Sequence, residues 1–291
     1  MASYAPVAPP QLLRKLRDLG DFVIGSYHLL LAHDVVARPK EYEDLFPRGS
    51  FIILDNSVIE LGKPVDIQVL LEAVYIVQPR LVVLPDSIGE MKSTLATSIA
   101  VAQSVELPGK TGWMAVPQGS NLDELKECSD VMLKEIPDLG AWGVGRFITA
   151  MTGSRVPFTK WLGDRRPNVT SSIGFMHLLG FSDNVDDDYL ASKLHGVMGI
   201  DSAVPVRMGQ RGRVISLDQG AIEPRGDFWE NPGNEVTPET LANLYLTRGW
   251  FQGLRRRPEV PNGPREAQQR ATSTIEIPQP PTPWAGSPNS I

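Results

Sequence analysis

The feature that most constrains the fold is a repeated unit, in which a short apolar run ends in polar residues and precedes a helical pattern. Such runs lie at 50–54 (SFIIL), 80–84 (RLVVL), 112–116 (GWMAV), 141–144 (AWGV), 173–179 (IGFMHLL) and 197–200 (VMGI). Continuous apolar runs are typical of strands buried on both faces, and their alternation with helices indicates right-handed parallel crossovers.

Helical patterns separate these runs, at about 10–19, 65–77, 91–103, 122–136, 186–195 and 237–257. At least six or seven strand–helix units predict an α/β protein with the (β/α)8 TIM-barrel fold and an irregular C-terminal extension. A doubly wound open sheet is the alternative, but the first strand-to-helix turn lacks a GxGxxG loop. A further strand is predicted at 22–24, and 213–224 (RVISLDQGAIEP) is interpreted as a hairpin or last strand.

Composition indicates one barrel domain, 1–257, and a Pro-rich tail, 258–291, that is expected to be disordered. The single cysteine, Cys128, is too few for a disulfide framework or a cysteine-rich zinc site. No apolar run approaches the roughly 18–20 residues of a membrane span, and the N-terminus lacks the order of a secretion signal. We therefore expect no membrane association and a cytoplasmic location.

Polar residues follow the predicted strands at the ends that a barrel brings to one mouth. They are Asp55, Asp86, Gln118, Gly145, His177 and Asp201. Asp201 ends the run MGIDSAVPVR, in which Pro205 prevents further ladder pairing and is expected to turn the chain away. In isolation Asp201 would be interpreted as a helix N-cap. Its place among other polar strand ends favours a nucleophile, with a second aspartate as acid or base.

Other chemistries remain open at this point. The three aspartates are suitable ligands for magnesium, so a metal-dependent hydrolase is a rival, although we expect neither a metal nor a cofactor. A lone His177 within an apolar strand is more often a hydrogen-bonded core residue than a ligand. The sequence contains no Ser-His-Asp order, Walker loop or HExxH motif.

Seven segments between residues 22 and 213 resemble, in the same order, motifs of the tRNA-guanine transglycosylases that insert queuine and archaeosine precursors. DSAVPVR (201–207) resembles their DCVxPTR signature, and GSYHLLL (25–31) resembles GNTYHLLL. The other five are LDNSVIELG (54–62) in place of DSGGFQ, VLPDS (83–87), VPQG (116–119) for VQGG, WGVGR (142–146) for GGxxVGE and HLLGF (177–181) for YLMGV.

Two departures favour one branch of that family. The zinc subdomain of the tRNA enzymes needs three cysteines, which this chain lacks. LDNSVIE is closer to the LDNGAxE form of the DpdA-like branch, which exchanges guanine in DNA for a 7-deazaguanine such as 7-cyano-7-deazaguanine. The resemblance thus implies a DNA-guanine transglycosylase. A tRNA-guanine transglycosylase and a catalytically inactive, base-binding or scaffold member are the alternatives.

The resemblance also implies roles for residues. Asp201 would attack C1′ of the nucleoside, with Asp55 as the second catalytic carboxylate. Asp86 would accept hydrogen bonds from N1 and the exocyclic amine, and Gln118 and the backbone near Gly145 would bind the base carbonyl. The remaining candidates are Tyr27, Phe175 and Met176 as stacking residues, His177 as a further substrate contact, and Arg207, Arg211 and Arg213 for phosphates.

The expected partners are DNA and a free 7-deazaguanine base. A base within a duplex is out of reach, so the target guanosine must be flipped out or single-stranded. The formal net charge of −6 argues against binding nucleic acid by bulk electrostatics, because phosphate neutralisation needs clustered Lys and Arg. A partner protein that supplies a DNA-docking surface is therefore a further expectation.

Overall fold

A computed structural model describes residues 2–20, 24–136, 139–164, 174–215 and 235–252. All of them belong to the unit Met1–Arg256. The predicted tail from 258 on, residues 216–224 of the predicted hairpin or strand, and residues 22–23 of the predicted strand at 22–24 lie outside the described residues.

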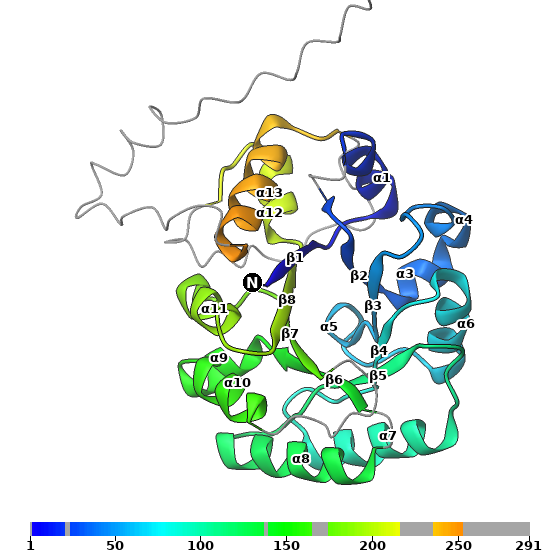
Figure 1. Cartoon of the computed structure of the whole chain (residues 1–291), viewed down its shortest axis with the longest axis vertical. Coiled ribbons are helices and arrows are strands. Elements are labelled where there is room, and N and C mark those ends of the chain that lie inside the picture. Colours follow the sequence, from blue (N-terminus) through cyan, green and yellow to red (C-terminus); the bar gives the residue numbers. More distant parts are fainter. Residues whose placement is uncertain (1, 21–23, 137–138, 165–173, 216–234, 253–291) are drawn as a thin grey trace, which may run out of the picture. The chain divides into compact units, whose positions relative to one another are not determined.

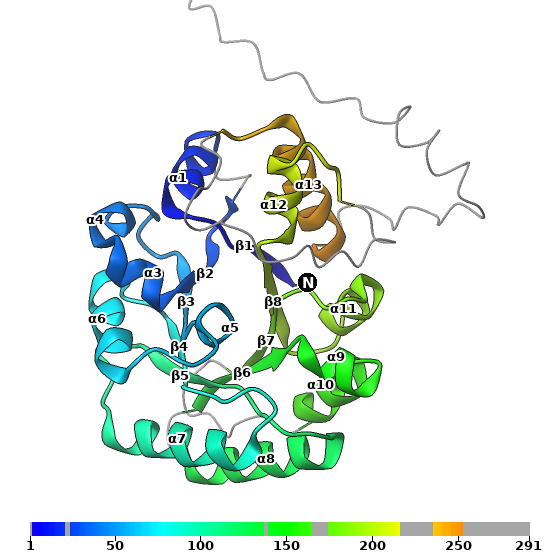
Figure 2. The same cartoon turned by 180° about the vertical axis from the view of Figure 1, so that it is seen from behind.

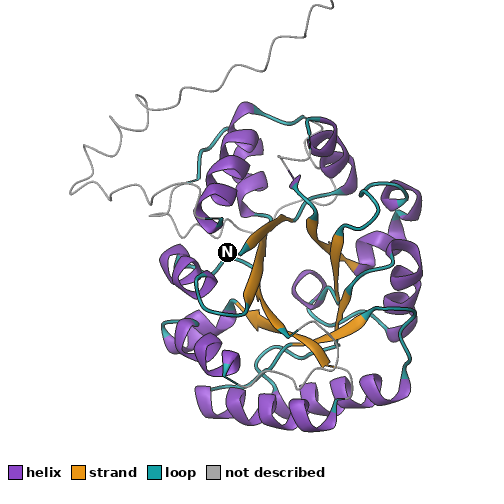
Figure 3. Cartoon of the chain, in the orientation of Figure 1, coloured by secondary structure: helices purple, strands orange, loops and turns teal. Residues whose placement is uncertain are grey.

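Eight parallel strands form the sheet, in the order β1-β8-β7-β6-β5-β4-β3-β2. They are β1 (Ser3–Pro6), β2 (Tyr27–Leu31), β3 (Phe51–Asp55), β4 (Leu81–Val83), β5 (Gly112–Ala115), β6 (Leu139–Gly145), β7 (Phe175–Leu179) and β8 (Val197–Ser202). The strands form a ring with helices outside it, and β1 and β2, the two ends of the order, lie side by side (Figures 1, 2 and 3). The predicted (β/α)8 barrel is confirmed.

Helices alternate with these strands. They are α1 (Pro10–Asp18), α3 (Ala32–Ala37), α4 (Pro39–Tyr42), α5 (Val58–Leu61), α6 (Ile67–Val77), α7 (Met91–Ser104), α8 (Leu122–Glu135), α9 (Phe147–Thr152), α10 (Val156–Gly163), α11 (Val185–Ser192), α12 (Val204–Gln210) and α13 (Pro238–Phe251). Side-chain caps begin three of the predicted helices. Asn121 accepts from the backbone N–H groups of Asp123 and Glu124, Asn184 accepts from that of Asp187, and Thr237 accepts from that of Thr240.

The first two strands differ from the prediction. β1 lies in the Pro-rich lead, where no strand was expected, and pairs with β8 so that Ala5 lies opposite Asp201. A four-residue segment that ends in proline carries little strand signal, and only closure of the barrel provides its partner. The second strand is Tyr27–Leu31, whereas Ile24, the described end of the predicted strand, is helical.

The apolar residues form two layers, one inside the barrel and one between the barrel and its helices. The inner layer contains Ala5, Val7, Leu29, Leu31, Ile53, Leu81, Val83, Met114, Val116, Ala141 and Phe175. Successive side chains of a strand point to opposite faces, so Leu29 and Leu31 lie inside while Leu30 belongs to the outer layer. Both faces are apolar, which explains the continuous apolar runs in the sequence.

The chain after β8 also differs from the prediction. Pro205 does not turn the chain away, because it lies in the first turn of α12, where the missing N–H needs no partner. Residues from Arg207 to Gln210, expected to be irregular, complete this helix. α12 packs tightly on α13, since a Cβ at Gly209 would overlap the backbone of Thr240.

Candidate active site

A cavity of about 530 Å³ opens at the C-terminal ends of the strands. Six residues predicted from strand ends and the following segment line it: Asp55, Asp86, Gln118, Gly145, Asp201 and Arg207. The short helix α5 crosses the mouth and contributes Val58, Ile59 and Glu60 to the wall (Figures 1 and 3). Convergence of side chains from several different strand–helix units is the arrangement that barrel enzymes use for their sites.

Asp201 presents one carboxylate oxygen to this cavity. Its Oδ1 accepts hydrogen bonds from His177 Nε2 at 2.9 Å and from the backbone N–H of Gly180 at 3.1 Å. Among the described residues, nothing donates a hydrogen bond to Oδ2. The Asp201 side chain is only 8% exposed. The two donors hold it in one orientation, which leaves Oδ2 available for a ligand.

His177 connects Asp201 to Tyr27. The carboxylate only accepts, so Nε2 of the imidazole donates to it, and in the neutral ring Nδ1 then accepts from the Tyr27 hydroxyl at 2.8 Å. Burial, followed by the charge of Asp201, raises the pKa of Tyr27 well above its ordinary value, which keeps the hydroxyl proton in place. Tyr27 and the fully buried His177 do not line the cavity, and their hydrogen bonds lead to Asp201. The geometry thus favours a role in positioning Asp201 over the predicted contact with a base.

Phe175 and Met176 are also absent from the cavity wall. Phe175 points into the barrel and packs against Phe51, with ring centroids 5.3 Å apart. Met176, on the opposite face of β7, packs outside the barrel near Gly163. Both lie at the start of β7, away from the mouth, so the cavity lining gives no support to the prediction that they stack on a base.

Asp55 ends β3 and lies in the same cavity as Asp201. Its Oδ1 accepts from the backbone N–H of Ser57 at 2.6 Å, and Ser57 adopts a left-handed conformation with φ 63°. Desolvation inside the cavity and the negative charges of Glu60, Asp201 and Asp86 raise the pKa of Asp55 well above its ordinary value, against the opposing effect of the Ser57 N–H. Asp55 is therefore the carboxyl suited to carry a proton.

Asp86 is held by two side-chain amides. Asn56 Nδ2 donates to its Oδ1 at 2.6 Å, and Gln118 Nε2 donates to its Oδ2. Both amides are themselves oriented, because Val58 N–H donates to Asn56 Oδ1 and Gly89 N–H donates to Gln118 Oε1. Burial raises the pKa of Asp86 to about 6 despite these hydrogen bonds. Asn56, one residue after Asp55 in LDNSVIELG, was missed as a site residue.

Arginines contribute unequally to the site. Arg207 of α12 lines the cavity, but Arg211 and Arg213 are exposed and lie beyond the C-terminal end of α12. Neither Arg211 nor Arg213 is among the residues that line the cavity. Arg146, which follows β6, lines the cavity and was missed as a site residue, although it belongs to the segment WGVGR.

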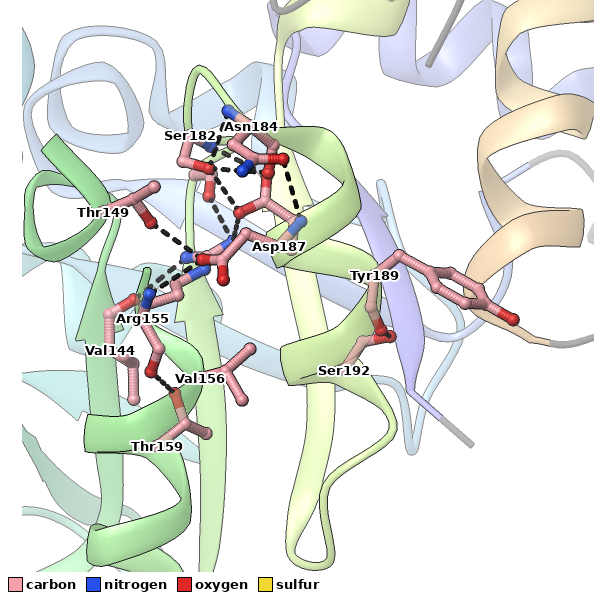
Figure 4. Close-up of polar contacts among 12 residues, drawn as sticks. Val144, Thr149, Arg155, Val156, Thr159, Ser182, Asn184, Asp187, Tyr189 and Ser192 are labelled. Atoms are coloured by element: carbon pink, nitrogen blue, oxygen red, sulfur yellow. Dashed lines mark hydrogen bonds and ion pairs between the residues drawn. The ribbon is translucent and has the colours of Figure 1, made fainter. Parts of the chain in front are cut away.

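A buried ion pair supports the loop after β7. Arg155 Nη2 lies 2.7 Å from Asp188 Oδ1, with both side chains 0% exposed, and donates to the carbonyl of Gly180 at 3.1 Å. Figure 4 shows Arg155 and Asp187 within this network, between the segment of Val144 and α11. Because Gly180 is the residue whose N–H donates to Asp201, Arg155 fixes that donor. No sequence motif identified this network.

Metal binding is the other chemistry that a group of aspartates can support. In the ranges that the structure describes, no group of three or more His, Cys, Asp or Glu side chains is arranged to hold a metal ion. The three aspartates of the rival hydrolase prediction are thus not arranged as a metal-binding group.

None of the described helices is long and apolar enough to cross a membrane.

No family model matches the chain, and no curated protein sequence matches it. Among solved structures, the chain is similar to an N-acetylneuraminate lyase from Mycoplasma synoviae, with 10% sequence identity and a TM-score of 0.42. The alignment covers 93% of this chain and 94% of the lyase. At that score and identity the likeness carries no argument about function.

Proposed function

We propose that the protein is a DNA-guanine transglycosylase that exchanges guanine in DNA for a 7-deazaguanine base. The observation that carries this proposal is the pairing of two unlike carboxyl groups in one cavity. Asp201 is oriented by His177 and Gly180 with Oδ2 available, and Asp55, with its raised pKa, is suited to hold a proton. A fixed nucleophile and a separate acid are what a double displacement at C1′ requires.

In the first half of the reaction, Asp201 Oδ2 attacks C1′ of the target nucleotide. The C1′–O bond forms as the C1′–N9 bond breaks, and the electron pair leaves with guanine. Asp55 gives its proton to the departing base, which thereby leaves as neutral guanine. Gly180 and His177 hold Oδ1 throughout, so only Oδ2 changes its bonding.

In the second half, a free 7-deazaguanine occupies the position that guanine has left. Asp55, now ionised, takes the N9 proton, and N9 attacks C1′. The C1′–O bond breaks and returns the electron pair to Asp201. Two successive inversions retain the configuration at C1′.

The base is read by the group around Asp86. Each carboxylate oxygen has lone pairs beyond those that Asn56 and Gln118 use, so Asp86 is able to accept from N1–H and the exocyclic amine of a guanine-like base. Phe147, which is partly buried in the wall beside Gly145, replaces Tyr27 and Phe175 as the aromatic residue available for stacking.

The substrate nucleotide must leave its stack to reach this cavity, because Asp201 and Asp86 are almost fully buried. Arg207 at the cavity is the residue of its cluster placed to contact the phosphate of that nucleotide. Arg211 and Arg213 are exposed beyond α12, where we expect them to contact flanking phosphates.

The deciding experiment is incubation with DNA and labelled guanine or 7-cyano-7-deazaguanine, followed by nucleoside analysis. We expect label in DNA and a covalent protein–DNA adduct detectable by mass spectrometry. Both should disappear in Asp201→Asn. Asp123→Asn is the matched control, since the Asp123 side chain is 95% exposed on α8, outside the site.

Three outcomes would contradict the proposal. Label in tRNA but not in DNA would identify the tRNA branch instead. Absence of label from both nucleic acids would overturn the enzyme assignment and favour an inactive, base-binding or scaffold protein. An adduct that persists in Asp201→Asn would place the nucleophile elsewhere.

A further inference from the structure

We propose that Arg155 is a positioning residue for the chemical step, and that it sets the rate at which Asp201 attacks C1′ by holding the backbone at Gly180. This inference rests on the proposed function and adds to it a residue that acts on the nucleophile from outside the cavity. Arg155 is not among the residues that line the cavity. Its effect on the reaction therefore has to pass through the groups that its side chain holds.

Two peptide groups flank the Cα of Gly180, and each is held by a different partner. The peptide before it donates its N–H to Asp201 Oδ1 at 3.1 Å, and its Leu179 carbonyl accepts from the N–H of Arg146 at 3.1 Å. The peptide after it presents the Gly180 carbonyl to Arg155 Nη2 at 3.1 Å. Gly180 has φ 70° and no Cβ to restrict its dihedral angles. The hydrogen bond from Arg155 thus limits the rotations that would turn the N–H donor away from Asp201.

The guanidinium of Arg155 also joins the ends of two strands. Its Nη1 donates to the carbonyl of Val144 in β6 at 3.3 Å, whereas the carbonyl that accepts from Nη2 follows β7. A guanidinium presents several N–H donors at fixed angles in one plane, whereas a lysine ammonium is a point charge without this geometry. Figure 4 shows Arg155 between the segment of Val144 and α11.

The carboxylates at the start of α11 fix the position of this guanidinium. Asp188 Oδ1 lies 2.7 Å from Arg155 Nη2. Ser182 in turn donates to Asp188, through its N–H to Oδ2 at 2.8 Å and through its hydroxyl to Oδ1 at 2.7 Å. The neighbouring Asp187 accepts from the backbone N–H of Arg155 at 2.8 Å. Both the backbone and the side chain of Arg155 are thus anchored, so the guanidinium has one position relative to Gly180.

Stability alone is a poor explanation for this ion pair. Both side chains are 0% exposed, and the free energy lost on desolvating two charges is comparable to that gained from their attraction. Arg155 Nε is also buried, and among the described residues it has no hydrogen-bond partner. Burial lowers the pKa of Arg155, and the negative charge of Asp201 is among those that oppose this effect. The guanidinium is therefore close enough to the nucleophile to attract it.

The test removes the pair without leaving an uncompensated buried charge. The double variant Arg155→Met/Asp188→Asn lacks both charges, and the asparagine oxygen still accepts from one donor of Ser182. Arg155→Lys is the second variant, which keeps the ion pair but loses the planar fork, and it decides the test if the double variant does not fold. Thr159→Val is the matched control, because it removes a buried hydroxyl that donates to the backbone carbonyl of Arg155 and leaves the guanidinium contacts intact.

Hydrogen exchange of the Gly180 amide, followed by NMR, measures the donor directly and needs no substrate. We expect this amide to be protected in the native protein and in Thr159→Val, and to exchange at least about 10-fold faster in the double variant and in Arg155→Lys. The single-turnover rate of covalent adduct formation with DNA measures the consequence. This rate should fall by about 10- to 100-fold in both Arg155 variants, because small displacements of a reacting group have effects of this size. The Kd for DNA should be unchanged.

Three results would overturn the inference. Unchanged protection of the Gly180 amide in the Arg155 variants would mean that the guanidinium does not hold this backbone. Faster exchange of the amide with an unchanged rate of adduct formation would show that the pair is structural only. An equal loss of rate in Thr159→Val would attribute the effect to reduced stability.

The two proposals fail separately. If the native protein and the Arg155 variants form the adduct equally fast, the inference fails and the proposed function stands. If the native protein forms no adduct with DNA, the proposed function fails, and exchange of the Gly180 amide still decides whether Arg155 holds the donor of Asp201. Faster exchange in the Arg155 variants then supports that role, and unchanged exchange refutes it.

Discussion

The effect of replacing Asp86 by asparagine on the free energy of unfolding should depend on pH. Compared with the native protein at the same pH, the variant should be more favourable at neutral pH than at acid pH. Burial raises the pKa of Asp86 from 3.8 to about 6. At about 1.4 kcal/mol for each pH unit, the ionised carboxylate destabilises the folded state by about 3 kcal/mol at pH 7.5. The pKa of Asp86 is higher in the folded chain than in the unfolded chain. The destabilisation is therefore absent below pH 3.8 and complete above about pH 6.

Asparagine removes the charge but also one hydrogen bond. The amides of Asn56 and Gln118 both donate to Asp86, and neither is free to turn over, since each carbonyl oxygen already accepts from a backbone N–H. One of these two N–H donors would then face the amide NH2 group of the introduced asparagine. The lost hydrogen bond would lower the free energy of unfolding by about 1–3 kcal/mol at every pH. At pH 7.5 the destabilisation from the lost hydrogen bond is nearly offset by the stabilisation from removing the buried charge. At pH 4 Asp86 is mostly protonated in the native protein, so the lost hydrogen bond dominates.

Urea denaturation of the native protein and Asp86→Asn at pH 4 and pH 7.5 measures this difference. The free energy of unfolding of the variant, relative to the native protein, should rise by about 2 kcal/mol from the lower to the higher pH. The control is Asp123→Asn, which removes a carboxyl group that is 95% exposed on α8 and lies outside the cavity. A pH-independent difference for Asp86→Asn would refute the reasoning, because it would mean that Asp86 titrates alike in the folded and unfolded chains.

Four further outcomes are expected. Tyr27→Phe removes the hydroxyl that donates to His177 and should lower kcat about 10-fold while the melting temperature changes little; an unchanged kcat would contradict the positioning role. Asp55→Asn should lower kcat at least about 100-fold at pH 7, as expected for loss of a general acid, and a smaller loss would assign that proton to another group. Gly209→Ala should destabilise the protein by about 1–3 kcal/mol in urea denaturation, since the new Cβ meets the Thr240 backbone; an unchanged midpoint would show that the helices can separate freely. Chelation with EDTA should leave base exchange intact, and lost activity restored by a divalent ion would support the metal-dependent hydrolase instead.

Local patterns predicted most of the barrel. Runs such as RLVVL and GWMAV are short, apolar on both faces and followed by helical periodicity, and these properties can be recognised without knowledge of the neighbours. β1 was missed because Ser3–Pro6 has no such pattern and becomes a strand only by pairing with β8. α12 was missed because Pro205, which ends strands, also fits the first turn of a helix.

The sequence by itself determined that polar strand ends exist and that they meet at one mouth, since parallel strands in a barrel all end on the same side. Asp55, Asp86, Gln118 and Asp201 follow from that rule. It could not determine which side chains face the cavity, because direction depends on strand register: Phe175 and His177 point into the barrel, and Met176 points out.

Only the tertiary structure decided how each carboxyl group is used. Its hydrogen-bond donors and its desolvation come from residues far away in the chain: His177 and Gly180 for Asp201, and Asn56 and Gln118 for Asp86. The sequence thus determined which groups meet, and the fold decided their protonation, their direction and their partners, because these depend on contacts that no local pattern encodes.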